Sequence, residues 1–484
     1  MSKDLINTSK QLHDFTVTEA AAAIKDGSLS ASTYAAALLR RNRDHKDMNA
    51  FITIDEDAVL EAASKADERR GAGKALGPLH GVPIAVKDSM NTFDLPTSIG
   101  THVLAGFMPK NDASIVASLR NAGAIIFGKN NLVEMSYGLT GLNAHYGQAV
   151  NPYDSTRVTG GSSGGAGASV GGRLVPAAFG GDTVGSIRVP ASFSGVVGFR
   201  PTTGRWAGTG VAPISNTFDT PGPMARSVAD VVLLDAVVTG SPLSRAGLSG
   251  RSLKGVRLGF APRQYLDLVD PEVERTFHES LAKLKDAGAE LIEIDLGDDF
   301  QTLAYQANWP VFFHETMPHV TQYLKEIEAP VSFDDIYKGL GANVDFFWSD
   351  AVVPGTPNYV SVTDYEHSLN VLRPSLQKRF ADAFRENGIE AILFPTTPLV
   401  APPIGTSSVV TIAGQEVPAL NIAKNVFASS CAGLPGISLP MGLSSGGLPI
   451  GLEIDGKAGD DVRLLDIAAL VSSVLGSIPA PNLK

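Results

Sequence analysis

The chain has 484 residues, of which 44% are apolar and 18% are charged, a balance typical of a folded globular protein and not of a disordered one. Its formal net charge of −11 offers the backbone of a nucleic acid few positive groups to bind, so we expect no nucleic-acid partner. The densest basic run, at residues 40–43, is followed at once by Asp44 and Asp47 and is predicted to be a solvated helix face.

The cysteine count and the apolar runs of the sequence bear on where in the cell the protein is expected. Because Cys431 is the single cysteine, an intramolecular disulfide and a multi-cysteine zinc site are excluded, and a reducing compartment is favoured. Residues 1–7 lack the basic and apolar regions of a signal peptide, and no run of about 18 apolar residues could span a bilayer. We therefore expect a cytoplasmic protein that makes no contact with membranes.

The first predicted elements are helices, and an alternation of strands and helices follows. Thr16 and Glu19 form a potential capping box before a run of alanines, and Ser30 is in position to cap a second helix. From about residue 79 the pattern alternates between extended and helical segments, as in α/β folds. The expected segments are strands at 82–87, 124–127, 290–296 and 391–394 and helices at 113–122, 271–287 and 462–475. One large mixed sheet is predicted, within a single domain of residues 1–484.

The middle of the chain is rich in glycine and poor in charge. Residues 160–210 hold 15 of the 50 glycines, and residues 158–199 contain three charged side chains, those of Arg173, Asp182 and Arg188. Glycine allows close backbone approach and positive φ, which a packed loop that presents N–H groups to a ligand requires. The segment is therefore predicted to be buried, with tight packing alone as the simpler explanation.

Residues 300–365 have a different character, since they hold 13 of the 34 aromatic side chains. An aromatic and irregular segment of this kind either forms local core or walls an apolar pocket. We expect residues of about 300–380 to form a variable, aromatic-rich substrate-pocket region of the domain.

Three segments carry residues suited to catalysis, and Lys87 ends the first of them. The preceding residues 82–86 are apolar on both alternating faces, which predicts a buried strand. Burial disfavours the charged form of a lysine and lowers its pKa, so Lys87 could act as a base near neutral pH. Taken alone, a strand-end lysine more often reaches solvent or pairs with a neighbour such as Asp88.

The second segment, residues 160–165, reads Gly-Gly-Ser-Ser-Gly-Gly and precedes a stretch of small residues that predicts a helix. Its hydroxyl and N–H groups would lie at a helix N-terminus, where serine caps in a glycine loop are the simpler explanation. The pattern Gly-x-Ser-x-Gly around Ser162 also fits a nucleophile elbow. However, residues 154–157 do not have the pattern of the buried strand that such an elbow follows.

The third segment, residues 180–190, is a glycine-rich turn that contains Ser186. Consecutive N–H groups in such a turn could hold an oxyanion, and a plain packed turn is the alternative. A serine hydroxyl becomes an effective nucleophile when a base takes its proton, and a tetrahedral intermediate needs donors aimed at its oxygen. A lysine, two serines and main-chain donors can supply both functions without histidine.

Taken together, these segments resemble the amidase signature family. Residues 160–165 match its Gly-Gly-Ser-Ser-Gly-Gly motif, and residues 185–193 match its Gly-Ser-Ile-Arg-Val-Pro-Ala-Ser-Phe motif. The serines at 162 and 186 are 24 residues apart, which equals the spacing in the family. Further matching segments, which extend the resemblance over most of the chain, are residues 79–88, 128–131, 198–202, 222–226 and 432–440.

The resemblance implies a fold and a catalytic set. The implied fold is the α/β amidase signature fold, with a large mixed β-sheet covered by helices on both faces and residues 79–226 as the signature core. The resemblance implies Ser186 as the nucleophile, Lys87 as the base, and Ser162 as a proton relay held by a cis peptide. The implied path is attack by Ser186, an acyl-enzyme, release of amine or ammonia, and hydrolysis by water, with no metal or cofactor.

The same resemblance assigns supporting roles around the nucleophile. The implied oxyanion donors are the main-chain N–H groups of Thr183, Val184, Gly185 and Ser186. Asp182, Arg188 and Ser163 are implied to support the loop without reacting. This sequence departs from the family at Val184, where glycine is most frequent, and at Gly181, where threonine is common. A β-branched residue tolerates fewer backbone conformations, so the shape of the hole or of the acyl pocket is expected to differ.

Within the family, two segments are most similar to the branch of indoleacetamide and mandelamide hydrolases, residues 202–206 and 219–227. This similarity favours small arylalkyl carboxamides as substrates, with aryl esters, anilides and carbamates as further candidates. The aromatic segment that begins at residue 300 agrees with this preference. Family habit also leads us to expect a homodimer.

Other residues offer competing interpretations. One is an esterase-like α/β-hydrolase that uses Ser162 with His314, His319 or His367 as its base. Another is an amidotransferase subunit that works in a tRNA-dependent complex, and a third is a scaffold that has lost catalysis, which the intact set of lysine and serines disfavours. His314 and His319 also form a near match to a zinc-protease motif, but Pro318 lies between them, so one helical face is not expected to present both.

Cys431 is the remaining candidate nucleophile. No histidine lies near it in sequence, and it sits in a stretch of alanine, serine and glycine. A buried small residue is the favoured interpretation.

Overall fold

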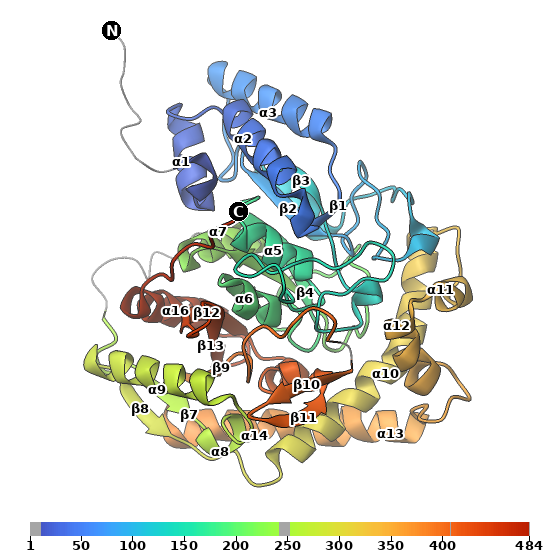
Figure 1. The fold of residues 1–484 in the computed structure, drawn as a ribbon, viewed down its shortest axis with the longest axis vertical. Coiled ribbons are helices and arrows are strands. Elements are labelled where there is room, and N and C mark those ends of the chain that lie inside the picture. The colour runs from blue at the N-terminus through green and yellow to red at the C-terminus, as the bar shows by residue number, and fades with distance from the viewer. Residues whose placement is uncertain (1–10, 242–251, 407, 484) are drawn as a thin grey trace.

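The computed structural model describes residues 11–241, 252–406 and 408–483 (Figure 1). Residues 1–7, on which the prediction about a signal peptide rests, lie outside the described residues. One sheet of 11 strands runs through the centre of the molecule, and helices surround it.

The strands are β1 (Phe51–Thr53), β2 (Pro83–Lys87), β3 (Ile125–Asn130), β4 (Ala177–Asp182), β5 (Val197–Arg200), β6 (Thr220–Ala225), β7 (Arg257–Phe260), β8 (Glu290–Glu293), β9 (Ala391–Pro395), β10 (Val409–Ile412), β11 (Gln415–Pro418), β12 (Gly436–Leu443) and β13 (Pro449–Gly456). The α-helices are α1 (Val17–Asp26), α2 (Ala31–Asp44), α3 (Glu56–Gly71), α4 (Ser114–Asn121), α5 (Gly164–Gly171), α6 (Arg188–Ser194), α7 (Val228–Thr239), α8 (Pro262–Tyr265), α9 (Pro271–Asp286), α10 (Phe300–Glu326), α11 (Phe333–Gly339), α12 (Ala342–Phe347), α13 (Val362–His367), α14 (Arg373–Asn387), α15 (Phe427–Ala432) and α16 (Asp461–Leu475). Short 3₁₀ or π-helical turns are η1 (Leu12–Asp14), η2 (Lys46–Met48), η3 (His102–Leu104), η4 (Glu134–Ser136), η5 (Trp348–Val352), η6 (Ser368–Leu372) and η7 (Ala419–Ala423).

The large sheet is mixed, as predicted. Its strand order is β1-β3-β2-β4-β6-β5-β12-β13-β9-β7-β8, and β10 and β11 form a separate hairpin. β2 runs parallel to both of its neighbours, with Ala85 opposite Ala178 of β4 and Lys87 opposite Asn130 of β3. The strands from β4 through β6, β5, β12, β13 and β9 pair antiparallel. Because parallel strands end at the same edge of a sheet, Lys87 and Asp182 come to one edge from neighbouring strands.

Helices cover both faces of the sheet, and β9 shows this directly. Ala391 and Leu393 belong to a hydrophobic cluster that also contains side chains of α9 and α16. Ile392 and Phe394, which alternate with them, belong to a second cluster that contains side chains of α10 and α14. Since successive side chains of a strand point to opposite faces, both faces of β9 are buried under helices.

Most of the elements predicted from the sequence are confirmed. The Thr16 hydroxyl accepts from the N–H of Glu19 and the Glu19 side chain accepts from the N–H of Thr16, so the capping box at α1 is formed. The Ser30 hydroxyl caps α2 through the N–H of Thr33. The predicted strand at 290–296 is shorter than expected, because β8 ends at Glu293.

The expectation of an irregular segment at residues 300–365 is wrong. α10 spans 27 residues and continues through Pro310 and Pro318, and α11, α12 and α13 follow it. The buried residues of α10 recur with helical spacing, for example at Phe300, Leu303 and Ala307. Burial of this long face against the second cluster stabilises the helix although each proline lacks an N–H to donate.

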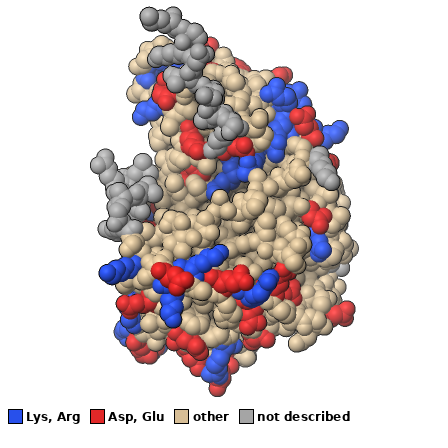
Figure 2. Space-filling view, turned by 60° about the vertical axis from the view of Figure 1, so that its left-hand side comes forward, with Lys and Arg blue, Asp and Glu red and all other residues tan. Residues whose placement is uncertain are grey.

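The surface mixes the two signs of charge. Figure 2 shows basic and acidic side chains next to one another on the face it presents. The basic run at residues 40–43 lies on α2, where Arg40 and Arg43 are exposed and Arg43 lies 3.5 Å from Glu56, so the prediction of a solvated helix face is confirmed. Within the described ranges, no helix has both the length and the apolar character needed to cross a membrane.

Candidate active site

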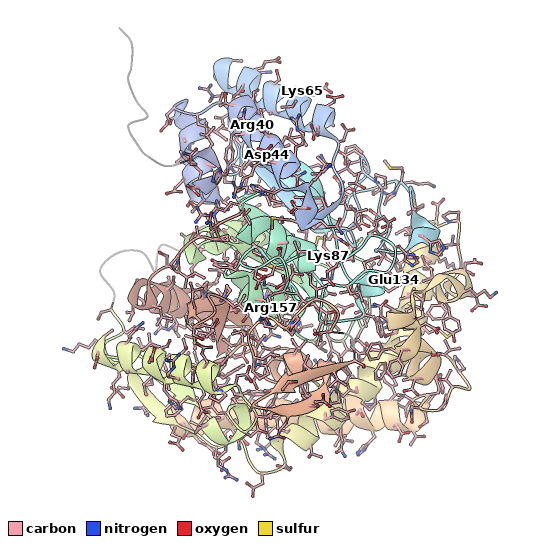
Figure 3. The ribbon with its side chains drawn as sticks, in the orientation of Figure 1. Arg40, Asp44, Lys65, Lys87, Glu134 and Arg157 are labelled. Carbon is pink, nitrogen blue, oxygen red and sulfur yellow. The ribbon has the colours of Figure 1, made fainter. Side chains whose placement is uncertain are left out.

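Lys87 ends β2 in the interior of the molecule (Figure 3). Its side chain is 1% exposed, and its Nζ donates a hydrogen bond to Oγ of Ser162 over 2.7 Å. Burial lowers the pKa of Lys87 to about 7, against the opposing effect of the negative charges of Asp219 and Asp182. Near neutral pH this lysine can therefore lose and regain a proton.

The simpler interpretation of Lys87, as a lysine that reaches solvent or pairs with Asp88, is wrong. The carboxylate of Asp88 lies 3.2 Å from Nζ of Lys129, a second buried lysine on β3. Lys129 also donates to the carbonyl oxygen of Met90 and to the hydroxyl of Thr97, over 2.7 and 2.6 Å. Lys129 is thus fully engaged in holding the loop after β2, whereas Lys87 contacts Ser162.

Ser162 lies in the loop that precedes α5. Its peptide bond to Gly161 is cis, as the resemblance implied, and its side chain is fully buried. The small residues of α5 permit close packing, since a Cβ on Gly165 would lie only 2.4 Å from the carbonyl oxygen of Ala50. The glycines therefore let the loop approach the sheet closely enough for Ser162 to meet Lys87.

Ser163 does not act as the helix cap that the sequence suggested. Its hydroxyl makes no capping bond to α5 and instead donates to the carbonyl oxygen of Gly181, 3.2 Å away. Its N–H donates to the carbonyl oxygen of Ser186 over 3.3 Å. This main-chain bond links the loop of Ser162 to the turn of Ser186. The hydroxyls of Ser162 and Ser186 do not hydrogen-bond to each other in the described structure.

The turn that carries Ser186 follows β4 and is organised by Asp182. The Asp182 carboxylate accepts from the N–H of Gly185 over 2.8 Å and from the N–H of Ile187 over 3.2 Å. Gly185 has a φ of 122°, and a Cβ there would lie 2.6 Å from a methyl carbon of Val426, so the turn requires glycine at this position. Three N–H groups of the turn have no hydrogen-bond partner among the described residues, those of Thr183, Val184 and Ser186. Of the four expected oxyanion donors, the N–H of Gly185 is already bonded to Asp182.

A buried ionic cluster lies behind this turn. Arg188 lies 3.1 Å from Asp182 and 3.0 Å from Glu453, and Arg200 lies 3.3 Å from Asp182. Burial alone would raise the pKa of Asp182, but the charges of Arg188 and Arg200 bring it well below its ordinary value. The Asp182 carboxylate therefore stays ionised and keeps its bonds to the turn.

Val184 replaces the usual glycine without backbone strain. Its φ lies outside the left-handed region, so a β-branched residue is accommodated, and it is 6% exposed. Its side chain lines an apolar cavity that also contains Ser186. The departure from the family pattern thus changes the wall of this cavity.

Several aromatic side chains line that apolar cavity. Its wall includes Leu139, Val184, Trp309, Phe312, Phe313 and Phe347. The free volume of this cavity is about 20 Å³, and Phe313 and Phe347 in its wall are half-buried. Of the aromatic segment, Trp309, Phe312, Phe313 and Phe347 line this cavity. Phe333 and Trp348 instead stack on each other in the core.

A second cavity of about 220 Å³ adjoins the first, and Lys87 lines it. Thr183 and Ile214 line both cavities. The second cavity is more polar, since Ser89, Asp182 and Asp219 also border it. Sequence reasoning assigned no role to Asp219, because a carboxylate before a strand carries no signal of which side chains it will meet.

Glu134 is another buried carboxylate that the sequence did not single out. It lies in η4, on the side of the molecule where α11 and α12 lie (Figures 1 and 3). It lies 2.9 Å from Nε2 of His145 and accepts from the N–H of Gly341 over 2.8 Å. Burial raises its pKa. Glu134 therefore ties the turn at the cavity to the segment that carries Phe347.

Comparisons with known proteins identify the family of the chain. The sequence model named "Amidase" matches residues 34–465. The chain belongs to the amidase family. It is 37% identical over 494 residues to a mandelamide hydrolase of Pseudomonas putida, covering 99% of this chain and 95% of the relative. It is 37% identical over 440 residues to an indoleacetamide hydrolase of Rhizobium radiobacter, covering 91% and 92%. A crystal structure of an amidase superposes with a TM-score of 0.85 at 30% identity, covering 96% of this chain and 100% of that one.

Family membership makes the protein a hydrolase of amides, and it confirms the expected amidase signature fold. The competing esterase interpretation requires a histidine as the catalytic base for Ser162. It is wrong on this point, because none of the three candidate histidines contacts Ser162 in this amidase. His314 stacks on Tyr365, His319 accepts from the N–H of Asn216, and His367 is exposed.

Two further interpretations of the sequence are a nucleophilic thiol at Cys431 and a zinc site at His314 and His319. Cys431 is fully buried in α15, as predicted, and burial raises the pKa of its thiol to about 12. In the described part of this amidase, no three His, Cys, Asp or Glu side chains are grouped so that they could hold a metal ion. Both histidines of the near-match motif lie on α10, where Glu315 between them binds the segment of residues 215–217.

Proposed function

We propose that the protein hydrolyses small aryl or arylalkyl carboxamides through an acyl-enzyme, with Ser186 as nucleophile, Ser162 as proton relay and Lys87 as base. The observation that carries the proposal is the 2.7 Å hydrogen bond between Lys87 and Ser162 in a site where burial brings the pKa of Lys87 to about 7. A base with a pKa near the working pH is the most effective general base.

In the first step, neutral Lys87 takes the proton of Ser162 while Ser162 takes the proton of Ser186. The Ser186 oxygen then bonds to the carbonyl carbon of the amide, and the carbonyl oxygen becomes an oxyanion. The bond from the N–H of Ser163 to the carbonyl oxygen of Ser186 supports this relay, because it holds the two serine segments together. Rotation of the Ser186 side chain toward Ser162 would close the path between the hydroxyls.

The oxyanion requires preorganised donors, and the turn after β4 offers them. The N–H groups of Thr183, Val184 and Ser186 are unbonded within the described residues, whereas that of Gly185 is held by Asp182. We assign the first three as direct donors and Gly185 as the residue that shapes the turn. Main-chain donors cost no reorganisation when charge develops, because the ion cluster behind the turn fixes them.

Collapse of the tetrahedral intermediate breaks the carbon–nitrogen bond. The leaving amine takes the proton from Ser162, which is replenished from protonated Lys87, so the base returns to its neutral form. A water molecule then loses a proton along the same path and attacks the acyl group on Ser186, which releases the acid and restores the enzyme. Esters, anilides and carbamates with an aryl group could follow the same path.

The aromatic cavity beside Ser186 supports an aryl or arylalkyl acyl group. Trp309, Phe312 and Phe313 present ring surfaces there, and offset or edge-to-face ring contacts stabilise a bound aromatic group. We further propose that the protein works in the cytoplasm, where its one buried cysteine needs no disulfide partner.

The test is the release of ammonia from phenylacetamide, mandelamide, benzamide and acetamide. For phenyl acetate and phenyl carbamate, as further substrates, the release of phenol is measured instead. We expect turnover of the aryl amides by the wild-type chain and its loss, by at least about 1000-fold, in Ser186→Ala and Lys87→Ala. Lys110→Ala, which removes an exposed lysine, is the matched control and should leave turnover unchanged.

Two outcomes would contradict the proposal. Turnover that persists in Ser186→Ala would identify another nucleophile. The absence of turnover by the isolated wild-type chain over the whole panel would instead favour a subunit that acts only with a partner chain.

A further inference from the structure

Asp219 has a fixed position between the two cavities. One of its carboxylate oxygens accepts a hydrogen bond from the hydroxyl of Thr183 over 2.6 Å. The other accepts from the N–H groups of Ile214 and Ser215 over 2.7 and 3.0 Å. Three donors therefore hold the carboxylate, and part of its surface remains exposed to the cavity that Lys87 lines.

The partners of Asp219 belong to the candidate site. Thr183 contributes one of the unbonded N–H groups of the turn, and both Thr183 and Ile214 line the two cavities. A hydroxyl anchored at 2.6 Å fixes the side chain of Thr183 and limits rotation of its main chain. Asp219 is thus in a position to set the direction of the Thr183 N–H.

The charge of Asp219 also acts on Lys87. Burial lowers the pKa of Lys87, and the negative charges of Asp219 and Asp182 oppose this effect by raising it. Asp182 is already paired with Arg188 and Arg200, whereas Asp219 has no arginine or lysine in ion-pair contact among the described residues. Asp219 is therefore the less compensated negative charge in the surroundings of Lys87.

The ionisation of Asp219 fits such a role. Burial raises the pKa of Asp219 to about 6, with a further contribution from the charge of Glu315 on α10. The pKa of Lys87 is about 7, so Asp219 carries most of its charge at the pH where Lys87 is half neutral. The other charged groups that interact with Lys87 or Asp219 are Asp182, Arg200 and Glu315.

We propose that Asp219 is a positioning residue for the hydrolysis: its bond to Thr183 aligns an oxyanion donor, and its charge tunes the readiness of Lys87 to accept a proton. This inference rests on the proposed function and adds a residue to it. Asp219 itself does not touch the reacting atoms.

Two substitutions separate the two effects. Asp219→Asn removes the charge and keeps the shape, because an amide oxygen can still accept from the N–H groups and the amide nitrogen can donate to the Thr183 hydroxyl. Thr183→Val removes the hydroxyl and leaves the charge of Asp219. Asp230→Asn is the matched control, since Asp230 also accepts from a threonine hydroxyl and a main-chain N–H, but between α7 and the first turn of α1.

The experiment measures kcat/KM for phenylacetamide from pH 5.5 to 9. We expect the acid limb of Asp219→Asn to move to lower pH by about one unit, because loss of a negative charge favours neutral Lys87. We expect Thr183→Val to lower kcat about tenfold, while the acid limb of its pH profile stays at the same pH as in the wild type. Thr183→Ser, which keeps the hydroxyl, should recover most of kcat, and Asp230→Asn should shift nothing.

Labelling of Ser186 by phenylmethanesulfonyl fluoride, followed by mass spectrometry over the same pH range, gives a second reading that requires no amide turnover. If the acid limb of Asp219→Asn lies at the same pH as that of the wild type, both in kcat/KM and in the labelling of Ser186, the proposed effect on Lys87 would be overturned. Equal kcat in Thr183→Val and wild type would overturn the proposed alignment, and this pair remains informative if Asp219→Asn does not fold. A wild-type chain that neither hydrolyses amides nor reacts at Ser186 would instead overturn the proposed function, and this inference with it.

Discussion

Nζ of Lys87 lies 2.7 Å from Oγ of Ser162, although the two residues are 75 positions apart in the chain. Lys87 comes from the end of a central parallel strand, and Ser162 comes from the loop before α5. Both residues are buried, with Lys87 1% and Ser162 0% exposed. Burial of this pair is what makes a lysine suitable as a base near neutral pH.

The pH dependence of catalysis follows from this burial. The pKa of Lys87 is lowered to about 7, so the lysine is neutral above that pH and protonated below it. We expect kcat/KM of the wild-type protein to rise about tenfold per unit up to pH 7 and to level off above it. A rate profile of ammonia release from pH 5 to 9 measures this. A profile that is flat, or that falls as pH rises through 7, would exclude neutral Lys87 as the base.

The same burial predicts that Lys87 lowers the stability of the fold. Below pH 7 the folded protein must hold a charged lysine out of water, whereas the unfolded chain holds it in water with a pKa near 10.4. Lys87→Met should therefore raise the free energy of unfolding by about 2 kcal/mol at pH 7, while it abolishes activity. The gain should shrink as pH rises from 7 to 10, where the unfolded chain also loses the proton. Urea titrations at pH 7 and 9.5 test both statements, and an equal gain at both pH values would contradict the explanation.

Asp182 is expected to be essential for stability. Asp182→Asn leaves Arg188 and Arg200 buried without their shared carboxylate and weakens the bonds to the turn of Ser186. Loss of one partner in a buried ion cluster costs about 3 to 5 kcal/mol. Because the pKa of Asp182 lies well below its ordinary value, the difference from wild type should persist down to pH 4. Asp295→Asn, which breaks an exposed pair with Arg263, is the control and should change the urea midpoint little.

Trp309 is expected to determine the preference for aryl substrates. It is 8% exposed and lines the cavity beside Ser186. Trp309→Ala should raise KM for phenylacetamide about tenfold and leave KM for acetamide nearly unchanged, because the smaller acyl group does not reach the ring. Tyr305→Ala, on the same helix but 60% exposed, is the matched control. An equal loss for both substrates would show that Trp309 supports the fold and not the specificity.

Gly181 and Gly185 should respond differently to replacement by alanine. Gly185→Ala places a methyl group 2.6 Å from Val426 at a φ of 122°, which forces the turn of Ser186 to move. We expect its kcat to fall at least about 100-fold. At Gly181, a Cβ would meet no atom within 4 Å, and the family frequently has threonine there. Gly181→Ala should therefore keep wild-type kinetics, and equal losses in both variants would contradict this account of the turn.

Local patterns in the sequence were enough to single out the candidate catalytic residues and to predict many elements. The unbroken apolar run before Lys87 indicated a strand buried on both faces, and β2 is such a strand. The capping box at Thr16 and Glu19 fixed the start of α1. The two glycine-rich motifs and their spacing indicated the family, because the motif residues are adjacent in the chain and can be recognised without the fold.

Other features depend on contacts that no local pattern reports. α10 was hidden from the sequence because prolines and crowded rings obscured its period, and only burial against the second hydrophobic cluster shows its helical spacing. The bond from Thr183 to Asp219 spans 36 residues, and the pair of Arg188 with Glu453 spans 265. Such pairs form because the strand order of the sheet brings their elements together. The sequence by itself therefore determined which groups can react, whereas the tertiary structure decided their burial, and hence the pKa of Lys87, and which carboxylates surround it.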